Sequence, residues 1–224
     1  MRARISADAA AQPSLRDGTR AGRLGQSQQR RLRRILAAAV ALAERGGFEA
    51  VRLRDVAQES QVALGTLYKY FHSKEDILLL ALTEEVERLE KQMVEHPLVG
   101  GTPLRRLTDF FQRATQGLTR RPHLARAVLR AIASGDRKTA AKVATFHERM
   151  TRMIHAALSG RAPDLTVTGR AALGDPREQQ VAFLLQHVWF ASLVGWAGGL
   201  HSTRTVAEQV HAAAALMRIG IRED

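Results

Sequence analysis

The block from Gly46 to Val94 constrains the fold more than any other part of the chain. Within it, the run VRLRDVAQESQVALGTLYKYFHSKEDIL (residues 51–78) predicts a short helix, a tight turn, a second short helix that ends in aromatic residues, and a capped long helix. This order is that of a helix-turn-helix unit joined to a helical body.

The composition of the whole chain agrees with a helical fold. Hydrophobic residues make up 45% of the 224 residues and aromatic residues only 5%, and no segment shows the alternation typical of a strand. We therefore predict an all-α fold with about nine helices. The absence of cysteine excludes disulfides, thiolate metal sites and a cysteine nucleophile, and it fits a reducing cytoplasm.

Positive charge is concentrated toward the N-terminus. The net charge is +12, and residues 1–71 hold 13 Lys/Arg against 6 Asp/Glu. Such a bias suggests that this end meets a polyanion, although general solubility explains the charge equally well when it is considered alone.

Three regions follow from the pattern of helix starts and stops. We expect a disordered basic tail over residues 1–26, a helix-turn-helix domain over 27–72, and an effector-binding and dimerisation domain over 73–224. The expected helices cover residues 27–45, 53–60, 64–70, 74–96, 103–119, 122–133, 137–158, 176 to 195 or 200, and 203–221. Residues 159–175 are expected to form a loop.

Residues 30–43 superficially resemble a signal peptide, because basic residues precede a short apolar run. That run covers only residues 35–43 and is far too short to span a bilayer. We therefore expect an amphipathic helix here, no membrane partner and a cytoplasmic protein.

The second helix of a helix-turn-helix enters the major groove, and here its small, hydroxylated and cationic side chains suit DNA contact. Leu67 and Phe71 are expected to turn inward. Taken singly, the other residues could equally be packing or surface residues; only their joint order favours DNA binding. The predicted DNA-binding residues are Arg52, Arg54, Ala63, Leu64, Gly65, Thr66, Tyr68, Lys69, Tyr70 and Lys74.

That joint order resembles the TetR family of bacterial regulators. The family's motif is met by Val56-Ala57, Val62, the run from Gly65 to Phe71, and Ser73-Lys74. Two departures bear on the turn. Ser60-Gln61 replaces the usual Ala-Gly, so Gln61 is expected to tolerate a positive φ. Ala63 replaces a serine cap, which costs about 1 kcal/mol of helix capping.

A narrower resemblance connects the chain with the KstR-like branch, repressors of cholesterol catabolism. It is carried by residues 62–68, Thr102-Pro103 with Arg106-Leu107, Arg121-Pro122, and Val188-Trp189 with Leu193 and Trp196. The resemblance implies a repressor that binds a palindromic operator on double-stranded DNA as a homodimer. By this resemblance its effector would be a steroid-acid CoA thioester or a similar small apolar molecule.

TetR-like proteins bind the effector among their middle helices and dimerise through the last two helices. The predicted ligand-binding residues are Met93, Leu107, Phe110, Phe111, Val128, Met150, Met153, Phe183, His187 and Phe190. The predicted dimer interface contains Trp189, Leu193, Trp196, Val206, Val210, Ala214 and Met217. Each could also be an ordinary core residue, and His187 could be a satisfied core or interface histidine.

No catalytic signature is present among the motifs that mark hydrolases, metalloproteases or nucleotide-binding enzymes. His147 and His155 could share a helix face, but without nearby carboxylates they make a weak metal site. We expect no enzyme activity, cofactor or metal. An architectural DNA-coating protein and a helical enzyme remain the alternatives.

Overall fold

Nine helices account for most of what the computed structural model describes: residues 15–134, 137, 139–166 and 175–217, with side chains from residue 25 onward. No strand occurs among these residues, which confirms the predicted all-α class. The helices are α1 (Leu15–Ala50), α2 (Leu53–Glu59), α3 (Leu64–Leu67), α4 (Lys74–Glu95), α5 (Pro103–Thr119), α6 (Pro122–Ala133), α7 (Ala140–Ser159), α8 (Pro176–Ala197) and α9 (Thr203–Met217).

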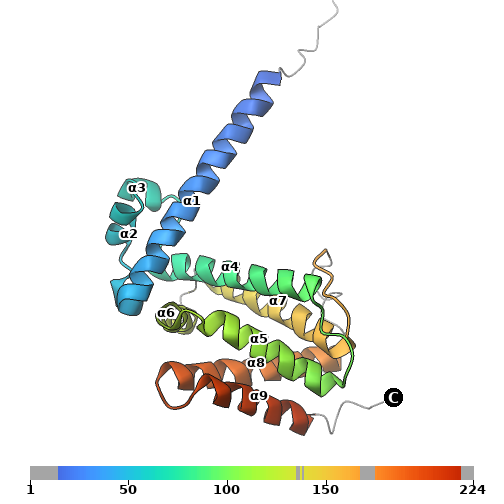
Figure 1. Cartoon of the computed structure of the whole chain (residues 1–224). Helices are drawn as coiled ribbons and strands as arrows, with labels where there is room; N and C mark the ends of the chain where they lie inside the picture. The colour runs from blue at the N-terminus through green and yellow to red at the C-terminus, as the bar shows by residue number, and fades with distance from the viewer. Residues whose placement is uncertain (1–14, 135–136, 138, 167–174, 218–224) are drawn as a thin grey trace, which may run out of the picture.

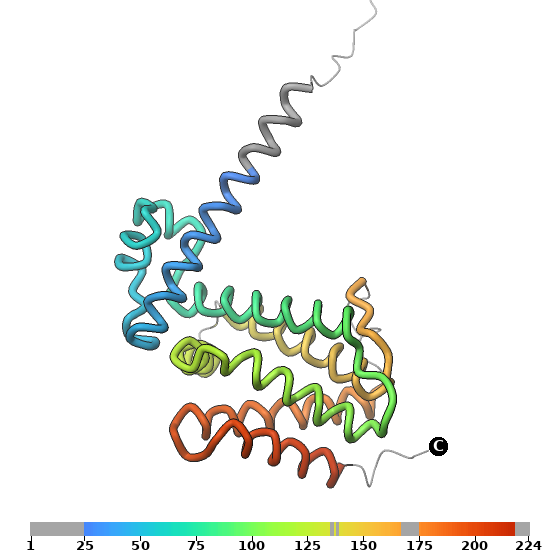
Figure 2. Tube along the Cα trace, in the orientation of Figure 1, coloured from blue at the N-terminus to red at the C-terminus, as the bar shows by residue number. Residues whose placement is uncertain are grey.

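The helices form an N-terminal unit, α1–α3, and a body, α4–α9. Figure 1 shows α1 extending away from the body, with α2 and α3 beside it and α4 leading into the stacked helices. The same path is visible in the trace of Figure 2. Helix α6 packs against both α1 and α4, while α8 packs against α7 and α9. The N-terminal unit and the α8–α9 pair therefore lie at opposite ends of the molecule.

Helix α1 begins at Leu15, twelve residues before the expected start at Ser27. Its regular part ends where the sequence predicts, because Gly46 (φ −147°, ψ 20°) and Gly47 (φ 65°, ψ −157°) leave the helical conformation. A Cβ atom on Gly46 would lie 2.7 Å from the Cβ atom of Ala50, so only glycine fits there. After this kink one further turn carries Phe48 and leads to α2.

Local capping sets the helix starts of the body. Ser73 accepts a hydrogen bond from the amide of Asp76 at 3.3 Å, as predicted for α4. Thr102 caps α5 in the same way. Asp175 accepts from the amides of Arg177 and Glu178 and completes a capping box at α8. Asp136, the residue before the expected helix 137–158, lies outside the described residues, and α7 begins at Ala140.

The caps allow a matched stability test. Asp175→Ala removes an acceptor of two amide hydrogen bonds, whereas Thr102→Ala removes an acceptor of one. We expect Asp175→Ala to lower the free energy of unfolding by about 1 kcal/mol and Thr102→Ala by no more than that. Urea denaturation monitored by helical circular dichroism measures both. Unchanged stability in Asp175→Ala would contradict the capping assignment.

One hydrophobic core runs through both the N-terminal unit and the body. In its centre the rings of Phe110 and Phe111 meet edge to face, 5.0 Å apart. The indole of Trp189 lies 5.8 Å from Phe111 and donates to the hydroxyl of Thr115 at 2.9 Å. A shared core means that α1 cannot move without a response from the body.

Polar contacts reinforce the joint between the two parts. The carboxylate of Glu44 on α1 accepts the amide of Leu124 in the first turn of α6 at 3.0 Å. Glu49 pairs with Lys74 at 3.2 Å and with Arg130 at 2.7 Å. The hydrogen bond from Lys74 is the main cause that lowers the pKa of Glu49, so this carboxylate stays ionised near neutral pH.

Candidate DNA-reading surface and body cavities

The turn between α2 and α3 is closed by backbone hydrogen bonds. The amide of Val62 donates to the carbonyl of Ala57 at 2.9 Å, and Gln61 has φ 54°. Among the described residues, Gln61 is the only non-glycine residue with a positive φ, as its place in the family motif predicts. Ala63 precedes α3 without a side-chain cap. The turn thus depends on backbone bonds and on an unusual glutamine conformation.

Buried side chains hold this turn against α1 and α4. Val56 and Ala57 on α2 and Leu67 on α3 are buried, and so is Phe71, as the sequence predicts. An ion pair between Arg45 and Glu59 links the end of α1 to the end of α2. The hydrogen bond from this guanidinium to Glu59 raises the pKa of Arg45.

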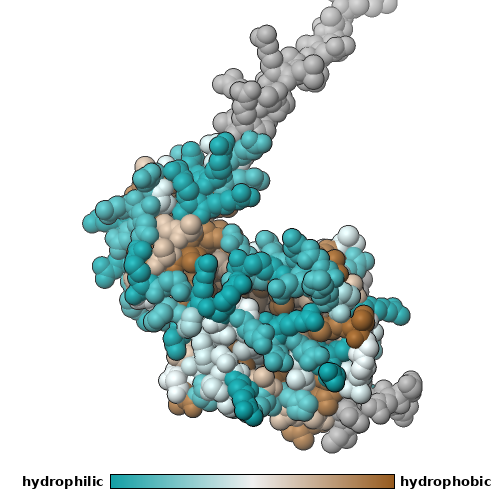
Figure 3. Space-filling model, viewed as in Figure 1, coloured by the Kyte–Doolittle hydropathy of each residue, from teal (hydrophilic) through white to brown (hydrophobic). Residues whose placement is uncertain are grey.

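Most of the predicted DNA-binding residues are exposed or half-buried on or beside α2 and α3, and we name this set the reading surface. Tyr68 is an aromatic residue with half of its surface (50%) exposed. No ion pair joins Arg54 to a carboxylate in the described part of the chain, so its guanidinium is available. Figure 3 shows hydrophilic residues over much of the N-terminal unit on the face in view. The exposed members are Arg52, Arg54, Ala63, Gly65, Tyr68 and Lys69, and the half-buried members are Leu64 and Thr66.

Lys74 and Tyr70 are placed differently. The ammonium of Lys74 lies 3.8 Å from the centre of the Phe48 ring and donates to the Phe48 carbonyl at 3.4 Å. These bonds fasten the start of α4 to the end of α1. The hydroxyl of Tyr70 accepts a hydrogen bond from Arg31 at 3.5 Å. Lys74 therefore stabilises the contact between α1 and α4. Arg31 is an additional cation near Tyr70 that the family motif does not include.

The predicted ligand-binding residues do not gather around one cavity. Met150 alone of the ten lines a described cavity. Met93, Leu107, Phe110, Phe111, Val128 and Met153 are packed in the core. Phe183 and His187 lie on the outer surface of α8, and Phe190 is half-buried. The Nδ1–H group of His187 donates to the Phe183 carbonyl at 2.7 Å, and its ring stacks at 6.0 Å from His147.

Two small cavities lie in the body, the first among α4, α5, α7 and α8 and the second between α4 and α7. The first, of about 60 Å³, is lined by Leu82, Val86, Met150 and Trp189, among others, with Arg88, Arg113 and Arg120 also in its wall. The second, of about 130 Å³, shares Leu82, Val86 and Phe146 with the first and adds Lys142 and Arg149. Both are smaller than the roughly 300–1,000 Å³ typical of ligand pockets, so a sizeable ligand must widen them.

The structure places most of the predicted dimer residues inward. Trp189, Leu193, Trp196, Val206, Val210 and Ala214 are buried in the core of their own chain, and Met217 is half-buried. They cannot present a surface to a partner without unpacking the body. Helix α8 is apolar on nearly all sides, so the sequence alone could not separate its inner face from its outer face.

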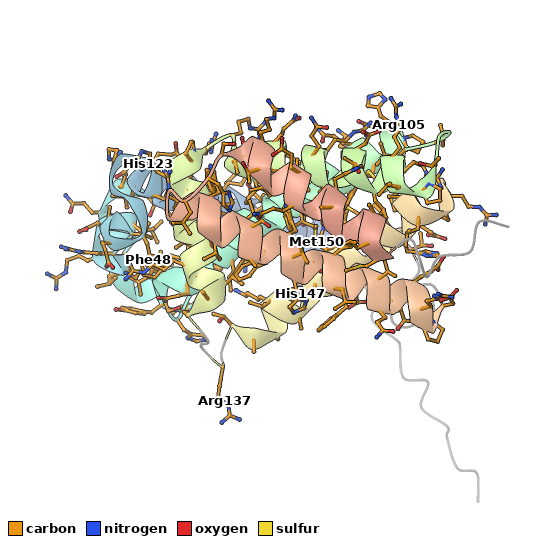
Figure 4. All side chains as sticks on the ribbon, turned by 90° about the horizontal axis from the view of Figure 1, so that it is seen from below. Phe48, Arg105, His123, Arg137, His147 and Met150 are labelled. Carbon is orange, nitrogen blue, oxygen red and sulfur yellow. The ribbon has the colours of Figure 1, made fainter. Side chains whose placement is uncertain are left out.

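The outer face of α8 carries its own apolar residues. Phe183 is 57% exposed, and Leu184 and Val194 are also exposed. Together with His187 and Ala191, they recur at the spacing of one helix face. In Figure 4, α8 and α9 lie side by side across the face toward the viewer. We name the exposed residues Phe183, Leu184, His187, Ala191 and Val194 the outer α8 face.

Helix α8 is the one described helix long and apolar enough to cross a membrane, and half of its apolar window is buried inside the protein. A core helix with one outward apolar face passes the same test. Among the described residues, no group of three or more histidine or acidic side chains could hold a metal ion. His147 binds the side chain of Gln186 at 3.1 Å, and His155 pairs with Glu178 at 2.8 Å.

Comparisons with known proteins agree on one family. Residues 35–81 match the family described as "Bacterial regulatory proteins, tetR family", and residues 100–217 match "Tetracyclin repressor-like, C-terminal domain". The chain is 34% identical over 200 residues to the HTH-type transcriptional repressor KstR of Mycolicibacterium smegmatis, covering 88% of this chain and 91% of that protein. It is 35% identical over 186 residues to KstR of Rhodococcus jostii, covering 82% and 81%.

Solved structures show the same fold. A TetR transcriptional regulator from Rhodococcus sp. RHA1 superposes with a TM-score of 0.73 at 21% identity, over 88% of this chain and 100% of that one. FadR from Bacillus subtilis in complex with stearoyl-CoA superposes with a TM-score of 0.55 at 17% identity, over 84% and 98%. The matches to both halves and to the KstR repressors show that this chain belongs to the KstR-like branch of the TetR family of transcriptional repressors.

Proposed function

We propose that the protein is a cytoplasmic, dimeric repressor that binds a palindromic operator and is released from it by a small apolar effector. The observation that carries this proposal is the reading surface: small, hydroxylated and cationic residues are exposed around α3, while Leu67 and Phe71 anchor it from within. This is the arrangement that places a helix in the major groove. We assign no enzyme activity and no membrane partner.

Within the reading surface the residues suit different contacts. Thr66 and Lys69 are assigned to base edges or phosphates, and Leu64 to a thymine methyl. Gly65 permits close approach, because nothing lies within 4 Å of the position its Cβ would occupy. Arg52 and Arg54 precede and begin α2, where guanidinium groups reach the DNA backbone.

Dimerisation is assigned to the outer α8 face. Burial of exposed phenylalanine, leucine and valine side chains against a partner is favourable by roughly 25 cal/mol per Å² of apolar surface removed from water. An identical face on a second copy covers it through a two-fold axis. Leu216 on α9, the helix that packs against α8, is also exposed.

The effector is assigned to the two small cavities that α4 and α7 both line. Apolar side chains such as Leu82 and Val86 line both cavities and suit a hydrophobic ligand, and Phe146 also lines both. KstR repressors are the relatives in sequence, and a protein of the same fold, FadR, is solved with stearoyl-CoA. We therefore propose an acyl or steroid-acid CoA thioester as the effector class. Its binding would change the distance between the two reading surfaces of the dimer. The operator half-sites that these surfaces contact lie about 34–36 Å apart.

Selection of genomic fragments by the purified protein tests the proposal. We expect enrichment of one palindrome whose half-site centres are about one helical turn apart, or a multiple of it. Addition of a long-chain acyl-CoA or a steroid-acid CoA thioester should then release the fragment. Recovery of fragments without a shared sequence would contradict operator binding and favour the architectural alternative.

A further inference from the structure

Lys142 on α7 connects the body to the end of the N-terminal unit. Its ammonium pairs with the carboxylate of Asp76 in the first turn of α4, and it lies 6.0 Å from the ring centre of Phe71. The side chain of Asp76 is only 9% exposed, whereas that of Lys142 is 43% exposed. The carboxylate of Asp76 also accepts the backbone amide of His72 at 3.2 Å. Lys142 thus balances a buried charge just after the reading surface.

The same lysine lines the larger cavity between α4 and α7. Lys142, Thr145, Phe146 and Arg149 lie on one face of α7, at intervals of three, four and seven residues from Lys142. The opposite wall comes from α4 and is largely apolar, with Leu79, Leu80, Leu82, Thr83 and Val86. The cavity therefore combines an apolar wall with two cations.

Both cations are already paired with carboxylates of α4. Arg149 donates to Glu90 at 2.8 Å, and this hydrogen bond raises the pKa of Arg149. The Glu90 side chain is 8% exposed and that of Arg149 is 16% exposed, so this pair is closed to solvent. Lys142 is the more accessible of the two cations, and an incoming anion can reach it first.

We propose that the effector carries an anionic group and that this group competes with Asp76 for the ammonium of Lys142. The inference rests on the proposed function and specifies the effector class, an apolar anion, and the residue through which it acts. The apolar part packs against the leucines of α4 and spreads past Phe146 into the smaller cavity. The anion pairs with the ammonium of Lys142 and thereby breaks the ion pair between Lys142 and Asp76.

Loss of Lys142 has a physical consequence for Asp76. A buried carboxylate without its cation is strongly unfavourable, so the first turn of α4 must shift toward water or open. That turn follows Phe71, the buried side chain that anchors the reading surface, by only a few residues. A ligand shifts a conformational equilibrium only through its different affinity for the two states. Lys142 can pair with the effector anion only when it no longer pairs with Asp76, so the effector binds the state with the broken ion pair more tightly.

Two dyes of matched shape test the anion directly on the full chain. Anilinonaphthalene sulfonate is an apolar anion, and N-phenylnaphthylamine has the same rings without the sulfonate; both fluoresce in apolar surroundings. We expect wild-type protein to bind the sulfonate about tenfold more tightly than the neutral dye, as one hydrogen bond to a charged group allows. Lys142→Met should abolish that preference, and Lys142→Arg should retain it.

The partner variant gives the sharper result. Asp76→Asn leaves Lys142 without its carboxylate, so we expect it to bind the sulfonate several-fold more tightly than wild type, opposite to Lys142→Met. Lys91→Met, an exposed α4 lysine outside both cavities, is the matched control and should behave as wild type. Lys142→Met, which leaves the buried Asp76 carboxylate without its cation, should also bind the selected operator more weakly without any ligand.

A merely structural role for the ion pair predicts that both variants shift dye binding in the same direction, and that outcome would overturn the proposal. Equal binding of the two dyes by wild type would overturn it as well. If Lys142→Met does not fold, the comparison of Lys142→Arg with Asp76→Asn retains the test. Failure to select an operator would count against the proposed function alone, because dye binding needs no DNA.

Discussion

Phe183→Glu is expected to convert the dimer into a monomer and to weaken operator binding by about 100-fold or more. A carboxylate at this exposed position leaves the protomer fold intact, because Phe183 is 57% exposed and its ring contacts the exposed His187 rather than the buried core. In the dimer the charge would be buried without a partner on both sides of the two-fold axis, which costs several kcal/mol. A monomer then contacts one half-site instead of two.

Sedimentation and operator titration measure the two consequences of this change. Val99→Glu is the matched control, because Val99 is an exposed apolar residue in the segment between α4 and α5, far in sequence from α8. It should remain a dimer with wild-type operator affinity. A Phe183→Glu protein that is still dimeric would place the interface elsewhere than on the outer α8 face.

Gly65→Glu is expected to leave the fold unchanged and to reduce operator affinity by about 100-fold, or about 2.7 kcal/mol. The backbone of Gly65 has an ordinary φ, and no atom lies within 4 Å of an added Cβ. The substitution therefore costs little stability beyond small helix-propensity terms. In the complex, however, the new carboxylate would meet phosphates and base edges at the closest approach of α3.

Measurement of both the melting temperature and the operator affinity separates an effect of Gly65→Glu on stability from its effect on DNA binding. Glu75→Gln, which changes a charge in the first turn of α4 outside the reading surface, serves as the control. A Gly65→Glu protein that binds operator as tightly as wild type would remove α3 from the DNA contact.

The local features of this fold were predictable from the sequence because neighbouring residues determine them. Ser73, Thr102 and Asp175 begin helices, since each carries an oxygen that accepts the first free amides. The positive φ of Gln61 follows from its place in a turn where the family has glycine. The pairing of Leu67 and Phe71 as buried anchors follows from helical spacing.

The features that depend on packing between helices were not predictable. Trp189 and Val194 both look like core or interface residues in the sequence, yet one is buried and the other is exposed. In an apolar helix without a polar face, the sequence does not indicate which side faces the core. The neighbouring helices determine which side is covered. Lys142 and Asp76 lie 66 residues apart, and no local pattern joins them.

A salt titration of wild-type protein on the selected operator and on a random duplex tests sequence-specific repression most directly. Binding through phosphates alone is expected to fall by about 10³–10⁵ between 50 and 200 mM salt if 6–10 phosphates are contacted. We predict that the operator remains bound at 200 mM salt, at least about 10³-fold more tightly than random duplex. Parallel loss of both complexes, with no preference at any salt concentration, would contradict operator recognition by the reading surface.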